Sequence, residues 1–375
     1  MAMRSGFALG MHLRNEDRRT GAAKKETMSR TWWAHYALER LVSALTGRPS
    51  LGMGNICSVP LPLPLSSADI EDSIIESRFG DKGKRPLIHQ NTPTSPRSMD
   101  LADRRDRSYP TTGSGAASSG SYLKSIVNLG EITQAALALY AADAVRGSWE
   151  SVQRTIAHQN DKLDAWATTL PEGLNFFHRS NAIAHRYRRE QNTLDILYRS
   201  TKILITRPCL CRLDRRISNQ TASSNDFNHR AALICVGAAK SIASLLPDAV
   251  ASNLITLYQA GPWWQMVHVI MQALVVLLLE VVLESMYFPD DRQEVIPSLK
   301  KLLRWLRIMR VNNKMAVRAY SISLGLLKKL TSNIKVVSIA LNSRFLIDKD
   351  SISSSSPASS HHDPYWYRQT TSNLY

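Results

Sequence analysis

Cysteine and histidine are the residue types that could ligate a metal in this chain, and their spacing argues against a metal site. The four cysteines in 375 residues are Cys57, Cys209, Cys211 and Cys235. A structural zinc site needs four ligands, usually as two close pairs, and only Cys209 and Cys211 lie near each other. We interpret this pair as part of a structural turn after Pro208, and we expect no metal or other cofactor in this chain.

The residues needed for catalysis form no recognisable pattern either. The sequence contains neither the G-x-S-x-G turn of serine hydrolases nor the H-E-x-x-H helix of zinc proteases, and no pair of carboxylates is placed to act as acid and base. Gly113, Gly115 and Gly120 have the spacing of a phosphate-binding loop, but no apolar strand precedes them. We expect that the chain is not an enzyme.

Arginine and histidine are frequent between residues 178 and 216. Such a group of cations could bind phosphates. The alternative is that these side chains cover the solvent side of a long helix and the loop after it. We favour the alternative, because the same helix needs Ile183, Leu194 and Leu197 for packing.

The overall composition is that of a folded protein. Hydrophobic residues make up 44% of the chain, which is enough for a large core. The formal net charge of +16 means that nucleic acid and membrane surfaces must be considered as partners, although the basic residues are scattered along the chain. Few cysteines and an N-terminus without a sustained apolar run indicate a reducing compartment and no secretory signal.

Helices are the elements that must position these residues. Apolar residues recur at helical spacing, Gly and Pro provide the breaks, and no segment alternates convincingly as a strand does. We therefore predict an all-α, multi-helix fold with a disordered internal loop. The predicted helices are 2–13, 24–46, 122–146, 148–168, 180–206, 227–245, 262–287, 297–310 and 313–331.

Composition also divides the chain into four parts. Residues 65–121 are expected to be a largely disordered linker, because their Ser, Thr, Pro and Gly content cannot bury enough apolar area. This linker separates an N-terminal part, 1–64, from a C-terminal helical part, 122–332. Residues 333–375 are expected to form a short helix and a disordered tail.

The helix predicted at 24–46 contains two adjacent tryptophans and has a well-defined end. Gly47 can adopt the left-handed C-cap conformation, and Pro49 cannot continue the helix. Arg40 lies inside the apolar stripe, where a buried guanidinium needs a carboxylate partner. The stripe consists of Trp33, Tyr36, Ala37, Leu41 and Ala44.

The segment SVPLPLPLS at 58–66 follows this helix. Its alternating prolines fix the backbone in an extended conformation, so it predicts a strap across the surface. The alternative is a motif that docks into an aromatic-lined groove, but a connector stiffened by prolines is more common in globular proteins.

A membrane-associated helical protein is the alternative reading of the C-terminal half. Residues 249–279 contain no charged side chain and are long enough to span a bilayer. The helix predicted at 298–310 is amphipathic and basic, as membrane-surface helices are. However, Gln265, His268 and Gln272 fall on one helical face, which favours a helix buried in protein, and the basic helix is flanked by two others, as in a bundle.

Several of these segments, in this order, resemble the fungal-specific transcription factor domain, the middle homology region of fungal binuclear zinc-cluster regulators. The first is ALGMHLRNED with KKETMSRTWWAHYALERLVSALTGRPSLGM and VPLPLP. Later ones are SWESVQ, KLDAWATTLPEGLNF, ILITRPCL, GPWWQMVHVIMQALVVLLLE and KKLLRWLRIM. The resemblance covers roughly 1–64 and 122–331. The residues that carry it are Trp32, Trp33, Leu38, Glu39, Arg40, Gly47, Arg48, Pro49, Arg207, Pro208, Pro262, Trp263, Trp264 and His268.

The resemblance implies an all-helical regulatory domain of a nuclear transcription regulator. Expected partners are the transcription machinery or other regulators, a second copy in a homodimer, and a small-molecule effector, without a membrane role. The family's zinc cluster needs six close cysteines, so we expect DNA contact only through a domain missing here. The chain also starts just before the helix at 24–46 that contains the two tryptophans. We therefore expect a truncated gene model or a relative of the family without a DNA-binding domain.

Overall fold

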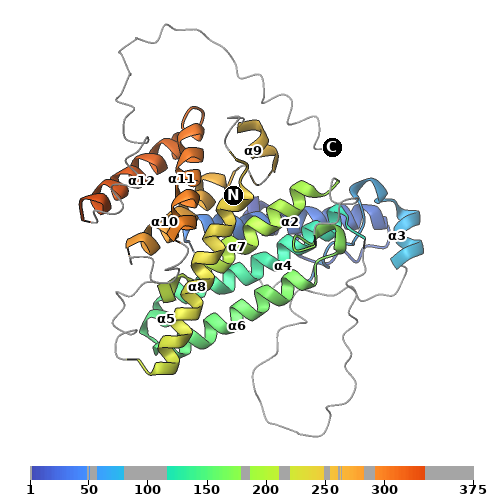
Figure 1. Cartoon of the computed structure of the whole chain (residues 1–375). Coiled ribbons are helices and arrows are strands. Elements are labelled where there is room, and N and C mark those ends of the chain that lie inside the picture. The colour runs from blue at the N-terminus through green and yellow to red at the C-terminus, as the bar shows by residue number, and fades with distance from the viewer. Residues whose placement is uncertain are drawn as a thin grey trace. The chain divides into compact units, whose positions relative to one another are not determined.

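A computed structural model describes residues 2–48, 50, 57–79, 116–178, 186–210, 220–248, 254–260, 262, 264–282 and 292–333. Every regular element in this part of the chain is a helix, so the all-α prediction is confirmed (Figure 1). The α-helices are α1 (Ala2–Ala8), α2 (Ala22–Thr46), α3 (Asp72–Phe79), α4 (Ser119–Leu137), α5 (Ala142–Arg146), α6 (Trp149–Thr168), α7 (Arg188–Leu210), α8 (Ala222–Leu245), α9 (Leu254–Ala260), α10 (Met266–Val282), α11 (Arg292–Met309) and α12 (Lys314–Asn333). Short 3-10 helices are η2 (Ser67–Asp69), η4 (Ala138–Tyr140) and η5 (Glu172–Leu174).

The chain divides into two compact units, Met1–Lys328 and Lys329–Tyr375, and the structure describes only residues 329–333 of the second. The first unit is built around α7, which packs against α4, α6, α8 and α10. Its main apolar cluster joins α4, α6 and α7, and Leu163, Leu194 and Ile205 are completely buried in it. Residues from both predicted helical parts, 1–64 and 122–332, therefore pack within one unit.

A second apolar cluster surrounds α2. Trp32, Trp33 and Tyr36 are buried against α1, the segment after residue 57, and α4. The predicted stripe is therefore confirmed for its first half, while Leu41 and Ala44 are partly buried and face a cavity described below. The helix ends as predicted, because Gly47 has a φ of 64° in the left-handed region that a C-cap requires.

The apolar helix predicted at 262–287 is α10, and it lies inside the protein. It packs against α7, α8 and α11, and its side chains Ile270, Leu274 and Leu277 are completely buried. Among the described residues, no helix combines the length and the apolar composition needed to cross a membrane. Residues 283–287 of the predicted helix lie outside the described part of the chain.

The amphipathic helix α11 is a member of the bundle. Its leucines at 299, 302, 303 and 306 are buried, and the helix packs against α8 and α10. Its predicted start at Pro297 is wrong, because the helix begins at Arg292. Proline near the N-terminal end interrupts only one backbone hydrogen bond, so the turns before it persist.

The predicted end of α7 before Pro208 is also wrong, since the helix continues to Leu210. Proline at 208 cannot donate to the carbonyl of Leu204, one helical turn earlier, and would leave that buried group unpaired. The hydroxyl of Tyr140 donates to this carbonyl instead, at 2.6 Å. A tertiary contact therefore replaces the hydrogen bond that proline removes.

Three helices or helix ends had no clear sequence signal. α3 lies in the segment predicted to be a linker, where Ile75 is its single buried residue. α9 was not predicted, and α8 begins at Ala222 rather than 227, capped by the hydroxyl of Thr221. Its first turns contact α6 through polar groups, which an apolar pattern does not detect. The remainder of the predicted disordered loop, 80–115, and of the tail, 334–375, lies outside the described residues.

Candidate functional site

Helix α2 holds the proline-rich segment 57–66 by charged hydrogen bonds in the protein interior. The carboxylate of Glu26 is completely buried and accepts bonds from the Arg30 side chain at 2.9 Å and from the backbone N–H of Leu63 at 2.8 Å. The Arg30 guanidinium donates in turn to the carbonyls of Leu63 and Leu65, at 3.1 and 2.7 Å. Both backbone groups of Leu63 are thus bound by one ion pair of α2.

Two further donors of α2 bind the same segment at one carbonyl. The oxygen of Pro60 accepts from the Ser29 hydroxyl at 2.5 Å and from the Trp33 indole N–H at 2.7 Å. Prolines contribute acceptors but no N–H donors, so the extended segment needs donors from outside, and α2 supplies them. The leucines between the prolines are buried, which makes the segment part of the core rather than a strap on the surface.

The buried cation Arg40 connects α2 to α4. Its Nη2 donates to the Tyr36 hydroxyl at 2.8 Å and lies 3.4 Å from the Glu131 carboxylate, and its Nη1 lies 4.0 Å from Glu39. The guanidinium also lies over the Tyr36 ring, 4.6 Å from its centroid. The predicted carboxylate partner of Arg40 is therefore confirmed.

Burial shifts the pKa values of this group of residues. It lowers the pKa of Arg40, and the charge of Glu39 opposes that change. It raises the pKa of Glu131 to about 6, although the guanidinium lies close by. Within the described structure the Nε and Nη1 groups of Arg40 have no hydrogen-bond partner. The cost of burying these charges therefore offsets much of the attraction between them.

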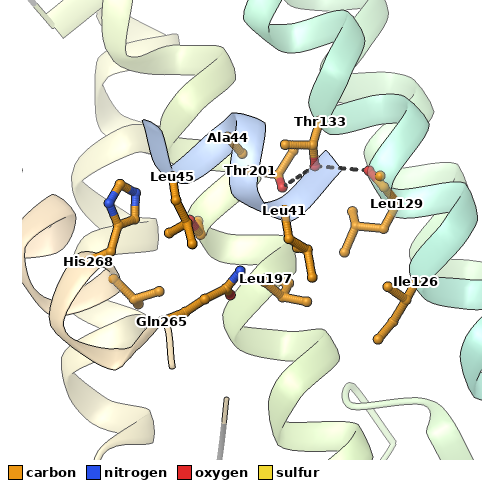
Figure 2. A pocket seen from close by; sticks show the side chains of 13 residues that line it. Leu41, Ala44, Leu45, Ile126, Leu129, Thr133, Leu197, Thr201, Gln265 and His268 are labelled. Atoms are coloured by element: carbon orange, nitrogen blue, oxygen red, sulfur yellow. Dashed lines mark hydrogen bonds between the residues drawn. The ribbon is translucent and has the colours of Figure 1, made fainter. Parts of the chain in front are cut away.

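A small cavity lies where α2, α4, α7 and α10 meet (Figure 2). Leu41 and Leu45 of α2 and Leu197 of α7 give it an apolar lining, and Gln265, which directly precedes α10, and His268 of α10 face it from the other side. Its volume of about 30 Å³ has room for one or two water molecules and not for a metabolite.

The polar groups around this cavity are mostly bonded to one another. Thr133 donates to the carbonyl of Leu129 at 2.9 Å and shares a 3.0 Å hydrogen bond with Thr201 (Figure 2). Gln272 exchanges two hydrogen bonds with Ser200, at 2.6 and 3.0 Å, which ties α10 to α7. Burial lowers the pKa of His268, and the nearby charge of Arg207 lowers it further, so His268 is neutral at pH 7.

Comparison with known proteins agrees with the sequence resemblance. Residues 1–179, which include α2, the segment it binds and α4, match the family described as the fungal specific transcription factor domain. This part of the chain is similar to that domain. The predicted recognition is therefore confirmed.

Two curated proteins are similar to the chain. Transcription regulator galc of Aspergillus niger is 28% identical over 90% of this chain and 44% of its own length. An uncharacterized transcriptional regulatory protein of Schizosaccharomyces pombe is 32% identical over 20% of this chain and 9% of its own length. The chain thus spans less than half of each relative. No solved structure matches it. Both names, like the family's, indicate transcription regulation, as predicted.

The signature residues of the fungal transcription factor domain fall into two groups. On α2, Trp32, Trp33 and Arg40 are buried and Glu39 accepts a hydrogen bond from Ser43, whereas Leu38 is 54% exposed. Arg48 is exposed beyond the cap, and Pro49 lies outside the described residues.

The second group lies on α7, just before α10 and in the first turn of α10. The guanidinium of Arg207 lies over the ring of Tyr140, 4.7 Å from its centroid. The next residue, Pro208, lies inside α7. Pro262 is buried, Trp264 is 47% exposed, and Trp263 lies outside the described residues. Among the described residues of this group, only His268 shares a cavity with α2. The structure thus does not gather the described signature residues of the domain into one site.

Sequence reasoning missed the residues that make most of these contacts. Glu26 and Arg30 are four residues apart on one helix, which is the spacing of a stabilising ion pair and was available as a signal. Glu131 and Tyr140 had no such signal, because their partners are far away in the sequence.

The described cysteines are free thiols, of which Cys209 and Cys235 are buried and Cys57 is half-buried. In the described part of the chain, no three His, Cys, Asp or Glu residues are grouped to hold a metal. Cys209 lies in the last turn of α7, so the prediction that it forms a turn after Pro208 is wrong. Burial raises the pKa of Cys209 and Cys235 to about 12, and it also raises that of Cys57. All three are protonated thiols at pH 7.

Proposed function

We propose that this chain is the regulatory part of a nuclear fungal transcription regulator and that it acts through protein partners. The observation that carries the proposal is that the polar side chains of α2 hold the domain together. Helix α2 is also the helix that most resembles the family. Glu26, Arg30, Trp33 and Arg40 all bind other parts of the same domain. Side chains engaged in this way build a scaffold.

The absence of catalysis is part of this proposal. Two observations support it: the buried thiols are protonated at pH 7, and the neutral His268 faces a cavity too small for a substrate. The names of the family and of the relatives also describe regulators.

We further propose that DNA is reached through another domain or a partner protein, in the nucleus. The transcription machinery, other regulators and a second copy of the chain are the candidate partners. A small-molecule effector bound between α2 and α10 would have to enlarge the cavity there, because its present volume of about 30 Å³ excludes a metabolite.

A tethered reporter assay tests the proposal. The chain is fused to an unrelated DNA-binding domain in a fungal cell, and transcript from a reporter with the matching site is compared with that from the DNA-binding domain alone. We expect a change of at least about threefold in either direction, corresponding to about 0.6 kcal/mol at 25 °C. Replacing Trp33, which is completely buried, by Ala should abolish the change, whereas Lys24→Ala on the exposed side of α2 should not.

An unchanged transcript level, with the fusion present in the nucleus at normal abundance, would contradict the proposal. A change that survives Trp33→Ala would also contradict it, because the effect would then not need the folded domain.

A further inference from the structure

Helices α11 and α12 hold a disproportionate share of the positive charge. Residues 295–333 contain nine lysines and arginines and neither aspartate nor glutamate, so more than half of the net charge of +16 lies in about a tenth of the chain. The net charge of the whole chain does not reveal that the positive charge is concentrated in this segment. In this segment Lys301 pairs with Asp248 at 2.7 Å, and Arg310 lies over the Tyr320 ring, 4.8 Å from its centroid.

Helix α12 has two apolar sides, and only one of them is covered. The covered side includes Ala316, Ala319 and Ser323, and the Ser323 hydroxyl contacts the sulfur of Met271 on α10 at 3.3 Å. The other side exposes Met315, Ile322 and Leu326, whose exposed fractions are 71%, 48% and 39%.

These three side chains are spaced seven and four residues apart, so they form a stripe along the helix. Two exposed cations, Lys314 and Arg318, flank the stripe. We call the five residues the α12 face: Lys314, Met315, Arg318, Ile322 and Leu326. The helix follows α11 after a short turn (Figure 1).

The combination of aliphatic side chains and cations selects the chemistry of a partner. Phosphates of nucleic acid would pair with the cations but would leave the aliphatic stripe in water, and unpaired bases stack on aromatic rings, which the α12 face lacks. Membrane-surface helices commonly add aromatic anchors to their aliphatic side chains, and the aromatic residues of these two helices, Trp305 and Tyr320, are buried. An acidic polypeptide with apolar side chains complements both features.

We propose that the α12 face docks an acidic segment of a partner protein whose apolar side chains are spaced three and four residues apart. The apolar side chains cover Met315, Ile322 and Leu326, and the carboxylates approach Lys314 and Arg318. This interaction does not rest on the proposed role in transcription, because it depends only on the surface of α12.

Fluorescence anisotropy with the full chain tests the proposal. The probe is a labelled synthetic peptide with leucines at helical spacing among Asp and Glu. Its controls are the same peptide with the leucines shuffled off one face, a duplex DNA, and phosphatidylcholine vesicles containing phosphatidylserine. We expect the helical-spacing peptide to bind at least fivefold more tightly than the shuffled one, and its Kd to rise with salt.

Two pairs of substitutions locate the site. Lys314→Glu with Arg318→Glu should weaken binding at least tenfold, and Met315→Ser with Ile322→Ser should weaken it about fivefold. The matched control reverses two exposed cations of α6, Arg154→Glu with Lys162→Glu, and should leave Kd within twofold. Circular dichroism and urea unfolding show whether each variant keeps its fold.

Three outcomes would overturn the proposal. The duplex or the vesicles could bind tightly while the acidic peptide does not; the shuffled peptide could bind as well as the helical one; or the α6 pair could weaken binding as much as the α12 pair. The first two are measured on the unaltered chain, so a variant that fails to fold does not leave the proposal untested.

Discussion

Removing the Glu26 carboxylate tests whether α2 stabilises the domain by holding the proline-rich segment. Glu26→Ala leaves the backbone N–H of Leu63 without its acceptor in a place with no access to water, and it removes the carboxylate partner of Arg30. The guanidinium keeps its bonds to the carbonyls of Leu63 and Leu65, so the segment is weakened rather than released.

The expected loss in the free energy of unfolding is about 4 kcal/mol. A buried backbone donor without a partner costs about 1–3 kcal/mol, and removing one member of a buried ion pair costs about 3–5 kcal/mol, with the two costs partly overlapping. Glu26→Gln should cost about half as much, because its amide oxygen still accepts from Leu63 and only the charge is lost. Urea unfolding followed by circular dichroism measures both values.

The chain contains a matched control for this experiment. Asp226 and Arg230 on α8 form an ion pair with the same four-residue spacing, but their side chains are 59% and 64% exposed. Asp226→Ala should therefore cost less than about 1 kcal/mol. If Glu26→Ala costs no more than Asp226→Ala, burial of the Glu26–Arg30 pair does not stabilise the domain, and the reasoning is wrong.

Three further predictions concern other contacts of the same unit. Gly120→Ala should lower the free energy of unfolding by about 3 kcal/mol in urea, because the added Cβ would lie 1.9 Å from the carbonyl oxygen of Leu63 and α4 would have to shift; a neutral effect would contradict that packing. Cys209 and Cys235, with pKa values of about 12, should stay unreacted with Ellman's reagent at pH 8 until urea unfolds the chain, and rapid labelling of the native protein would contradict their burial. The pKa of Glu131 is raised from 4.5 to about 6, so the folded state binds its proton more tightly than the unfolded state does. The stability of the native chain relative to Glu131→Gln should therefore fall by about 1 kcal/mol as pH rises from about 3.5, below the unfolded pKa, to about 7, above the folded one, a value halved for solvent screening, and a rise over this range in urea titrations would contradict it.

Features that depend on local pattern could be predicted from the sequence. The tryptophan helix, its glycine cap and the buried apolar helix α10 each have a periodic stripe or a specific end signal within a few residues. The polar face of α10 was also informative: Gln272 pairs with Ser200 and His268 faces a cavity, as expected for a helix surrounded by protein.

Features that depend on partners distant in the sequence could not be predicted. Proline at 208 was read as a helix end, and only the hydroxyl of Tyr140, 64 residues from the carbonyl that it satisfies, explains why the helix continues. Similarly, the first turns of α8 looked like a polar loop because Asn228 bonds to the Trp149 indole and has no apolar signal. A pattern within one segment has no information about either contact.

The proline-rich segment shows how local sequence pattern and contacts with distant residues combine. Its sequence correctly implies an extended backbone, and it implies a surface strap only if the carbonyls are assumed to face water. Four donors from α2 and α4 bind these carbonyls instead: the side chains of Ser29, Arg30 and Trp33 and the backbone N–H of Gly120. The segment can be buried because its prolines reduce the number of N–H groups that need acceptors, while α2 supplies donors for the carbonyls. The polar residues of α2 and the prolines after it are therefore two halves of one interaction, and a change in either should destabilise the domain in the same way.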